Sequence, residues 1–338
     1  MRTHLLLFSS LLVYAAPTAF AGVTVSSPGN GNDVASPFTL SANASACSSQ
    51  NIAAMGYSFD NSSDTTIVYN NSIQSRISAS TGAHTLHVKA WGVKGSACVT
   101  DVAINVTGSS SGANIPSYAT RVSAIQTLSN WTGVNDSASG GGYSTGTTNL
   151  TGSPSLSGQS RQFSTQLASY GGVRYYVSFG DDESATNFVY DGDIYLNSTA
   201  SSVGNIEMDM NQVMPNGQTV IFGLQCDGWS STWDYTANLG SAQSPVDRWI
   251  HSTVYCNPQK WSTNVWHHVQ VQYSRDNSGN VTYKSVWFDG YQMNINATVF
   301  SAFALGWSPT LLTNFQLDGI ASGGSPVVFL DNLTVYRW

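Results

Sequence analysis

Charge is scarce in this sequence of 338 residues. Charged side chains make up 9% of it, Lys and Arg together number 12, and the formal net charge is -7. A protein that binds a phosphate backbone needs a basic surface, so this composition argues against nucleic acid as a partner. Hydrophobic residues nevertheless make up 41% and aromatic residues 12% of the chain. Because such side chains require burial in a core, the composition excludes a disordered chain.

Long apolar runs are missing beyond the N-terminus. The run at residues 5–13 is too short to span a bilayer. It follows Arg2 and precedes Ala19, Phe20 and Ala21, whose small alanines are typical of a cleavage site. Residues 1–21 therefore predict a secretory signal peptide. We expect a secreted, monomeric protein that does not bind a membrane.

Several catalytic and metal-binding motifs are missing too. The sequence has no Gly-x-Ser-x-Gly, no phosphate-cradling glycine loop and no His-Glu-x-x-His, which leaves esterase, nucleotide-binding and zinc-protease functions without support. It has no Cys-x-x-Cys either, so a metal site is a poor explanation of the four cysteines. In an exported protein they predict two disulfides, with three pairings open. Sequence proximity favours Cys47 with Cys98 and Cys226 with Cys256.

A short segment rich in Gly and Ser, residues 108–116, ends at Pro116 and predicts a flexible linker. It separates a domain at residues 22–107 from a domain at residues 117–338. Before the linker, apolar and polar residues alternate at 38–42, 84–90 and 102–106. This period of two predicts half-buried strands of a β-sandwich.

The same pattern continues after the linker, and no helical period interrupts it. Turn residues separate segments rich in β-branched and aromatic residues, which predict strands at 173–179, 188–196, 205–211, 219–226, 249–255, 266–273, 281–288, 315–317 and 327–336. This number of strands suits two large packed sheets. The predicted fold class is all-β throughout.

Two family resemblances refine this prediction. Residues 25–31, 82–86 and 88–91 resemble bacterial immunoglobulin-like domains attached to secreted enzymes and adhesins, which implies an immunoglobulin-like sandwich acting as a spacer. Residues 190–195, 266–271 and 329–336 are similar to concanavalin A-like lectin and glucanase domains. That resemblance implies a jelly roll over residues 117–338.

One predicted strand carries two carboxylates on one face. In Ile206-Glu207-Met208-Asp209-Met210-Asn211, alternation sends the apolar residues into the core and places Glu207, Asp209 and Asn211 together on the opposite face. Residues two apart on a strand lie about 6.7 Å apart, so the two carboxyl groups can approach the separation used by retaining glycosidases. Acidic residues on a solvated strand face are equally ordinary.

This strand resembles the Glu-x-Asp-x-Glu strand of laminarinase-like glycoside hydrolases. The resemblance implies Glu207 as the nucleophile and Asp209 as the carboxylate that tunes it. The family's acid/base position is occupied by Asn211, and by Gln212 in the bulged form of the motif, and neither amide can donate a catalytic proton. We therefore expect polysaccharide binding, with Asn211 and Gln212 as binding residues, and keep glycoside hydrolysis as the alternative.

Aromatic residues support a glycan ligand, because C–H faces of sugars pack on indole rings. Trp229, Trp233 and Tyr235 follow Cys226 in a turn-rich segment that predicts a loop over the cleft. Trp249 and His251 share one face of a later strand. These five residues are the further candidates for substrate binding.

Three other hypotheses remain open. A polysaccharide lyase would use a Tyr or His base with Arg and Gln, and Arg248, His251, Tyr283 and Gln292 are present without the full motifs. No cofactor is required, although Asp331 with residues 181–183 could hold a structural Ca²⁺. A protein adhesin on the cell surface is the alternative without a glycan.

Overall fold

A computed structural model describes residues 22–62, 65–77, 79, 82–109, 112–136 and 140–338, and within these residues it contains strands and short 3-10 helices but no α-helix. The all-β prediction is confirmed. The predicted signal peptide lies outside the described residues. None of the described residues forms a helix long and apolar enough to cross a membrane.

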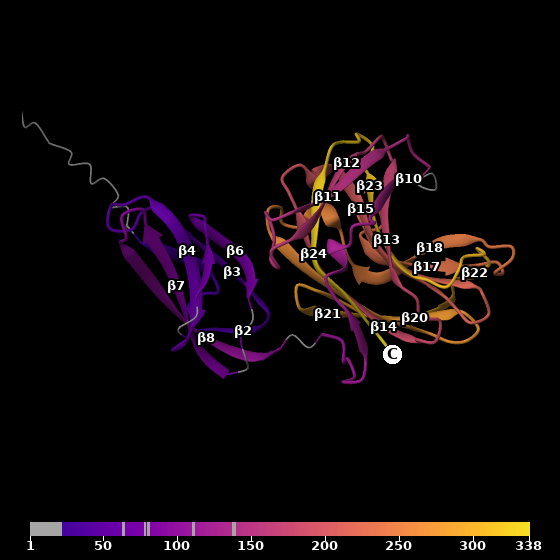
Figure 1. Cartoon of the computed structure of the whole chain (residues 1–338), viewed down its shortest axis with the longest axis horizontal. Helices are drawn as coiled ribbons and strands as arrows, with labels where there is room; N and C mark the ends of the chain where they lie inside the picture. Colours follow the sequence, from indigo (N-terminus) through magenta and orange to yellow (C-terminus); the bar gives the residue numbers. More distant parts are fainter. Residues whose placement is uncertain (1–21, 63–64, 78, 80–81, 110–111, 137–139) are drawn as a thin grey trace, which may run out of the picture.

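The N-terminal part of the chain is a sandwich of two sheets (Figure 1). One sheet has the order β1 (Val23–Ser27), β3 (Phe38–Ala44) and β6 (Ser72–Ile77). The other has the order β2 (Asn32–Ser36), β8 (Ala97–Ser109), β7 (Gly82–Gly92), β4 (Ile52–Phe59) and β5 (Thr66–Val68). Alternate residues point between the sheets, as in β3, where Phe38, Leu40 and Ala42 are buried and Thr39 is exposed.

The C-terminal part is a larger sandwich of two eight-stranded antiparallel sheets of the jelly-roll type. The front sheet has the order β10 (Thr132–Asp136), β13 (Gly172–Gly180), β23 (Leu311–Gly319), β15 (Val203–Val213), β16 (Thr219–Asp227), β17 (Thr232–Asn238) and β18 (Asp247–Tyr255), with β22 (Ala302–Phe303) beside β16. The back sheet has the order β11 (Thr145–Thr151), β12 (Ser160–Gln166), β24 (Val327–Arg337), β14 (Asn187–Leu196), β19 (Trp266–Arg275), β20 (Asn280–Phe288) and β21 (Tyr291–Phe300), with β9 (Thr120–Val122) beside β24.

Each sandwich has its own hydrophobic core, and no residue belongs to both. The small core lies between residues 23 and 106, and the large core lies between residues 122 and 335. Burial of these apolar side chains is the main favourable term for each sandwich. The segment between the cores includes the predicted linker, whose Ala113 donates its amide hydrogen to Gln270 Oε1 on β19.

Two disulfides close the sandwiches, one in each. Cys47 pairs with Cys98, and Cys226 on β16 pairs with Cys256, which directly follows β18. Both predicted pairings are confirmed. The second disulfide joins β16 to the end of β18, across β17, at one edge of the front sheet.

A buried cation, Arg76, links the two sandwiches. Arg76 on β6 donates to Asp289 Oδ1 in the turn between β20 and β21, at 3.1 Å, and to Pro37 O in its own sandwich, at 3.2 Å. Its side chain is 6% exposed. His267 Nδ1 shares a hydrogen bond of 2.7 Å with the other oxygen of Asp289. The carboxylate therefore bridges a histidine of its own sheet and an arginine of the N-terminal sandwich.

Candidate functional site

A cleft of about 980 Å³ lies over the outer face of the front sheet. Its floor is formed by the strands in the middle of that sheet, above all β15 and β23. Ile206, Met208 and Met210 point into the large core, whereas Glu207, Asp209 and Asn211 line the cleft. The predicted alternation of β15 is therefore confirmed.

The strand register brings polar residues from distant parts of the sequence into rows across the floor. The Glu207 row contains Arg174, Gln316, Glu207, Gln225, Asp234 and His251, each directly opposite the next on a neighbouring strand. Adjacent strands lie about 4.8 Å apart, so side chains in one row are within reach of their neighbours. Charged groups and amides therefore adjoin one another across the whole width of the sheet.

Parallel rows lie on either side. The Asp318 row contains Asp136, Gly172, Asp318, Asn205, Asp227 and Thr232. The Asp209 row contains Asn314, Asp209 and Gly223. Gly223 leaves space beside the acid, since a Cβ atom there would lie 3.0 Å from Asp209 Oδ1 and 2.5 Å from the Thr236 methyl group. Asp209 Oδ1 and Asn211 Oδ1 are buried and have no hydrogen-bond partner.

Negative charge dominates the lining. Seven carboxylates contribute to it, namely Asp136, Glu207, Asp209, Asp227, Asp234, Asp247 and Asp318. Among the described lining residues, Arg174 is the only Lys or Arg. Repulsion between like charges inside a protein favours protonation of some of these groups.

Glu207 and Asp209 form a close acid pair. Burial and the neighbouring charge of Asp209 raise the pKa of Glu207 well above its usual value, and Asp318 and Asp136 add to that effect. Burial also raises the pKa of Asp209, to about 6, although a hydrogen bond with Glu207 and another with Asn314 favour its ionised form. The two carboxyl groups therefore titrate as a coupled pair, which binds its first proton more tightly than an isolated carboxyl group does.

Asp318 is the third perturbed acid on the floor. Burial raises its pKa to about 7, and the nearby charge of Asp136 contributes. Asn205 donates to Asp318 Oδ2 at 3.0 Å, and Gln316 donates to Asp318 Oδ1 at 3.2 Å. Gly172 leaves room for the carboxyl group of Asp318, because a Cβ atom there would lie 2.0 Å from Asp318 Oδ1.

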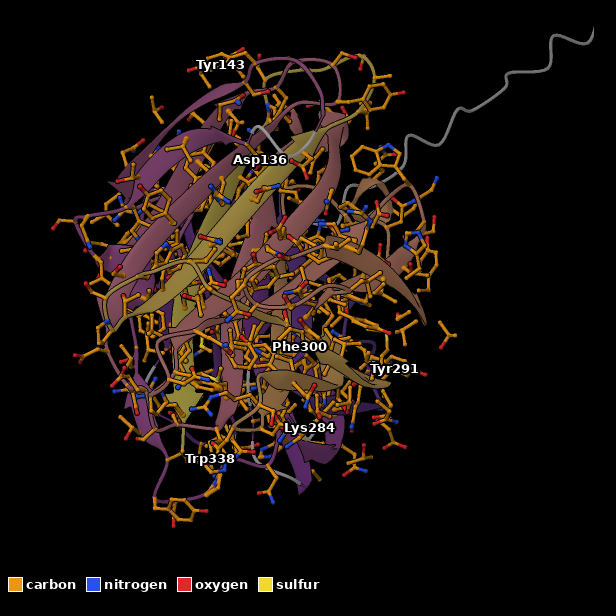
Figure 2. The ribbon with its side chains drawn as sticks, turned by 90° about the vertical axis from the view of Figure 1, so that its right-hand side faces the viewer. Asp136, Tyr143, Lys284, Tyr291, Phe300 and Trp338 are labelled. Atoms are coloured by element: carbon orange, nitrogen blue, oxygen red, sulfur yellow. A yellow bond between two sulfur atoms is a disulfide. The ribbon has the colours of Figure 1, made fainter. Side chains whose placement is uncertain are left out.

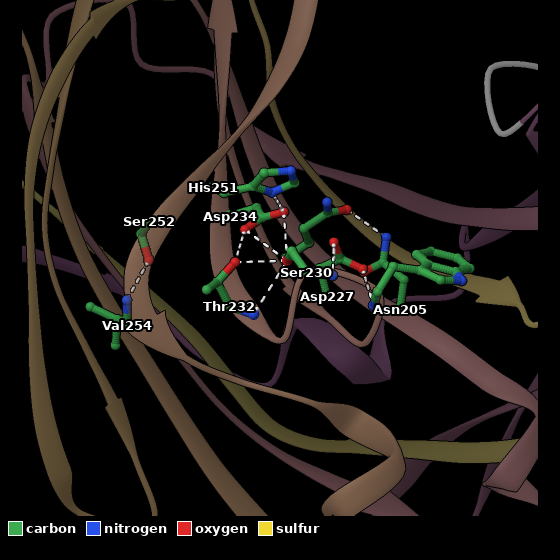
Figure 3. A network of polar contacts seen from close by, with 10 residues as sticks. Asn205, Asp227, Ser230, Thr232, Asp234, His251, Ser252 and Val254 are labelled. Carbon is green, nitrogen blue, oxygen red and sulfur yellow. Dashed lines mark hydrogen bonds and ion pairs between the residues drawn. The ribbon is translucent and has the colours of Figure 1, made fainter.

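One wall of the cleft carries a hydrogen-bonded acid and histidine (Figure 3). Asp234 Oδ2 and His251 Nδ1 share a hydrogen bond of 2.7 Å, and Thr232 donates to Asp234 Oδ1 at 2.6 Å. The Asp234 side chain is fully buried, whereas that of His251 is 65% exposed. Asp234 therefore fixes the ring, and the histidine faces the cleft opening.

Asp227, Asp234 and His251 also have ligand atoms within 4.8 Å of one another, a spacing that suits a metal ion. The surrounding donors argue against one. Backbone N–H groups of Trp229 and Ser230 donate to the two oxygens of Asp227, and hydroxyl and imidazole groups occupy Asp234. Donor hydrogens directed at these oxygens repel a cation, so this network fits a self-contained hydrogen-bonded wall.

Aromatic side chains lie at both ends of the cleft along the strand direction. Trp229 is 52% exposed and its ring centroid lies 6.4 Å from that of Tyr170, next to the Asp318 row. Gly204 leaves room for the indole of Trp229, because a Cβ atom there would lie 2.8 Å from the ring. Trp307, 40% exposed, lines the other end, and Trp249 lines the cleft from within the edge strand β18.

Two of the predicted aromatic ligands are placed differently. The segment expected to be a loop contains β17, in which Asp234 and Thr236 face the cleft. Trp233 has no exposed surface, and Tyr235 packs against the large core beside Tyr283. The prediction that these two rings cover the cleft is wrong, because strand alternation turns them inward.

Gln212 is not a cleft residue either. It is fully buried, it donates to Asp182 O at 2.6 Å and Ala185 O at 2.8 Å, and its Oε1 accepts from Arg275 Nε at 2.7 Å. Every polar atom of this side chain is engaged within the protein. Its predicted binding role is therefore wrong, and it fastens β15 to the loop before β14.

Asp331 does not fit a calcium site. Its carboxylate is buried and accepts hydrogen bonds from the Ser155 and Ser157 hydroxyls, the Leu156 and Ser157 amides and the Gln126 side chain. Asp182, the other expected ligand, accepts from Ser184, Ala185 and Arg337. Calcium requires oxygen ligands with free lone pairs, whereas these carboxylates face donors.

The residues proposed for a lyase are not brought together. Tyr283 is fully buried, with its hydroxyl group 3.0 Å from Thr236 Oγ1, so it cannot reach a ligand. Gln292 lies on β21 of the back sheet. His251 lines the cleft, whereas Arg248 points away and donates to Asp247 O.

Sequence reasoning missed half of the floor. Asn314, Gln316 and Asp318 alternate with the buried residues Phe315 and Leu317 on β23. This is the same polar-apolar pattern as in β15, and it could have identified these three residues as candidates for the cleft face. The position of β23 directly beside β15 depends on the strand order, which the pattern alone does not contain.

Comparison with known proteins gives distant structural likenesses only. No protein-family model matches the sequence. No curated protein matches it either. A family 11 carbohydrate-binding module from Clostridium thermocellum, in complex with a β-1,3-1,4-mixed-linked tetrasaccharide, is 12% identical, with 66% of this chain and 96% of that chain covered and a TM-score of 0.29. The carbohydrate-binding module CBM66 from Bacillus subtilis is 13% identical, with 61% and 95% covered and a TM-score of 0.32.

Arcelin-5, a lectin-like defence protein from Phaseolus vulgaris, is 10% identical, with 65% of this chain and 98% of that chain covered and a TM-score of 0.37. Likeness at this level says nothing about the ligand of the present chain. Its function must be inferred from the cleft itself.

Proposed function

We propose that this chain is a secreted protein that binds a polysaccharide in the cleft of the front sheet. Export follows from the N-terminal segment, with its short apolar run and alanines, and the two disulfides suit an oxidising compartment. We also infer that the protein acts as a monomer. The N-terminal sandwich, which resembles immunoglobulin-like domains, serves as a spacer.

The observation that carries this proposal is the row structure of the cleft floor. Amides from Asn205, Asn211, Gln225, Asn314 and Gln316 adjoin carboxylates along the floor of the cleft. Sugar hydroxyls donate and accept hydrogen bonds together, so alternating amides and carboxylates match them better than a uniform set of donors would. An apolar small molecule would instead require a mostly hydrophobic pocket.

The length and the ends of the cleft suit a chain of sugars. From Asn205 to Asn211 the floor extends over about 20 Å along β15. Trp229 and Trp307 at its ends offer apolar ring faces, on which the C–H faces of sugar rings can pack. A linear glycan following the strands would meet an aromatic ring at each end and hydrogen-bonding groups between them.

A glycan panel tests the proposal. The purified protein is titrated with soluble β-glucans, xylan, cello-oligosaccharides and amino-sugar oligomers, and the best ligand is then tested on Trp229→Ala. We expect binding about tenfold weaker in this variant, because an exposed platform is lost. Tyr291→Ala is the matched control, since Tyr291 is 74% exposed on β21 and lies apart from Asp136 of the cleft (Figure 2). Failure to bind any glycan would refute the proposal.

Glycoside hydrolysis is the second candidate, and the Glu207–Asp209 pair favours it. Burial and mutual repulsion raise the pKa of both carboxyl groups, and acid-catalysed cleavage requires a carboxyl group whose pKa is raised in this way. Asn211 stands at the position of the family's acid/base and its Oδ1 has no partner. Binding therefore remains the first proposal.

The release of reducing ends distinguishes the two candidates. Hydrolysis predicts new reducing ends that disappear in Glu207→Gln and persist in Asn211→Ala, with the glycan still bound by both variants. If the best ligand stays intact over long incubation with the wild-type protein, catalysis is excluded. If a protein ligand binds and cleft variants leave that binding unchanged, adhesion replaces the glycan proposal.

A further inference from the structure

The acid groups of the cleft are arranged unevenly, and the densest group lies at one end. Asp136, Asn205, Glu207 and Asp318 form what we call the acid corner, at the meeting of the Asp318 and Glu207 rows. All four side chains are more than nine-tenths buried. Glu207 is influenced electrostatically by both Asp136 and Asp318.

Neutral donors satisfy this corner only in part. Asp318 accepts from Asn205 and Gln316, and Gln316 also donates to Asp136 Oδ2 at 3.4 Å. Asn205 Oδ1 is buried without a hydrogen-bond partner. The corner therefore has an unused acceptor among three carboxyl groups, and Arg174 is the only Lys or Arg among the described residues that line the cleft.

We propose that the acid corner binds the ammonium group of an amino sugar, so that the cleft selects a cationic glycan over a neutral or an anionic one. This inference rests on the proposed glycan-binding function and names its ligand class. An ammonium group carries three N–H donors and no acceptor, which matches an unused amide oxygen beside carboxylates. A cation also relieves the repulsion among the acids, whereas a uronate carboxylate would add to it.

The location supports a sugar rather than a free ion. Trp229 and Tyr170 line the same end of the cleft, so an apolar ring face lies close to the acids. A sugar ring packed on the indole would carry its amino group at the edge of the ring, within the same small region. A bare metal ion would gain nothing from the aromatic rings.

Three hexasaccharides of the same linkage and length test the inference. Glucosamine, N-acetylglucosamine and glucose hexamers linked β-1,4 differ only in the group at C2, which is an ammonium, an acetamide or a hydroxyl. Binding is measured by calorimetry in near-neutral buffer at low and at high salt. We expect the glucosamine hexamer to bind about tenfold more tightly than the other two, with the advantage shrinking at high salt.

Proton release provides a second readout. Cation binding should displace a proton from the acid corner, because Glu207 and Asp318 bind protons more tightly than ordinary carboxyl groups. The measured enthalpy should then depend on the ionisation enthalpy of the buffer. The hydroxyl and acetamide hexamers should show no such dependence.

Variants locate the effect. Asp318→Asn should abolish the preference for the glucosamine hexamer, so that its affinity falls to that of the neutral hexamers measured on the same variant. Asp181→Asn, which removes the same charge from an exposed turn, is the control. An equal loss in both variants would mean general attraction by net charge and would overturn the assignment to the corner.

The outcomes separate the two proposals. If a neutral hexamer binds as tightly as the glucosamine hexamer, the cationic-glycan inference fails and the glycan-binding proposal survives. If none of the hexamers binds and the wider glycan panel is negative, the proposed function fails and the inference fails with it. Thermal melting of Asp318→Asn verifies that the variant is folded.

Discussion

The acids of the cleft and Asp289 at the junction of the two sandwiches behave in opposite ways. The side chain of Asp289 is 36% exposed, whereas Glu207 on the cleft floor is 7% exposed. Asp289 at the junction accepts hydrogen bonds from Arg76, from His267 and from the His268 amide. These donors hold its pKa below the usual value, although burial acts against them. In the cleft, Glu207 faces other carboxyl groups, and its pKa is raised.

The comparison shows that the partners of a carboxyl group, together with its burial, decide whether its pKa is lowered or raised. A carboxylate surrounded by donors holds segments together, as Asp289 and Asp331 do. Acids that face one another repel each other when ionised, and a cationic ligand relieves that repulsion. The predictions below test this distinction by removing one charge at a time.

The largest effect is expected at Asp331. Replacing it with Asn puts an NH₂ group where the hydroxyl and amide donors of Ser155, Leu156 and Ser157 now point. Buried donors that lose a charged acceptor are costly, so we expect a loss of about 3 kcal/mol or more in the free energy of unfolding. Urea denaturation measures it, with Asp181→Asn as control. A loss no larger than the control's would contradict the conclusion that the Asp331 carboxylate holds these segments together.

At Asp318 we expect the substitution to raise the free energy of unfolding and not to lower it. Because its pKa rises from 3.8 to about 7 on folding, the folded state binds this proton more tightly than the unfolded state. Its stabilising contribution is therefore present below about pH 4 and is lost as the pH rises through about 7. Asp318→Asn removes this loss and should be more stable than the wild type above neutral pH, by about 1 to 3 kcal/mol.

A pH series of melting curves measures this difference. The advantage of Asp318→Asn should grow from acidic to neutral pH. Asp289 has a lowered pKa, so its contribution is present above its unfolded value and is lost as the pH falls. Asp289→Asn should accordingly be less stable than the wild type at neutral pH and approach it in acid. Parallel curves for the two variants would break the comparison.

The smallest effect is expected at Arg76. Arg76→Gln removes the charge that pairs with Asp289, while His267 remains on the same carboxylate. We expect a loss of about 1 to 2 kcal/mol and a wider distribution of distances between the sandwiches. Small-angle scattering and limited proteolysis at residues 108–116 report the change. The control is Lys94→Gln on the exposed surface, which should alter neither.

Much of the fold, and one strand of the candidate site, could be predicted from the sequence. Alternation in β15 predicted which face carries Glu207 and Asp209, since that periodicity is a local property of a strand. It failed for Trp233, because a turn-rich composition concealed the short strand β17. It also could not reveal that β23 lies beside β15, since strand order is a property of the whole chain.

The strand order determines when the cleft can form as the chain is synthesised and folds. β23, residues Leu311–Gly319, inserts between β13 and β15, which precede it by about a hundred residues or more in the chain. Until that late segment arrives, Arg174 and Glu207 have no Gln316 between them, and the acid corner lacks Asp318. A growing or prematurely ended chain would therefore carry no finished cleft. The floor of the cleft is complete only once β23 has been synthesised and has paired with both β13 and β15.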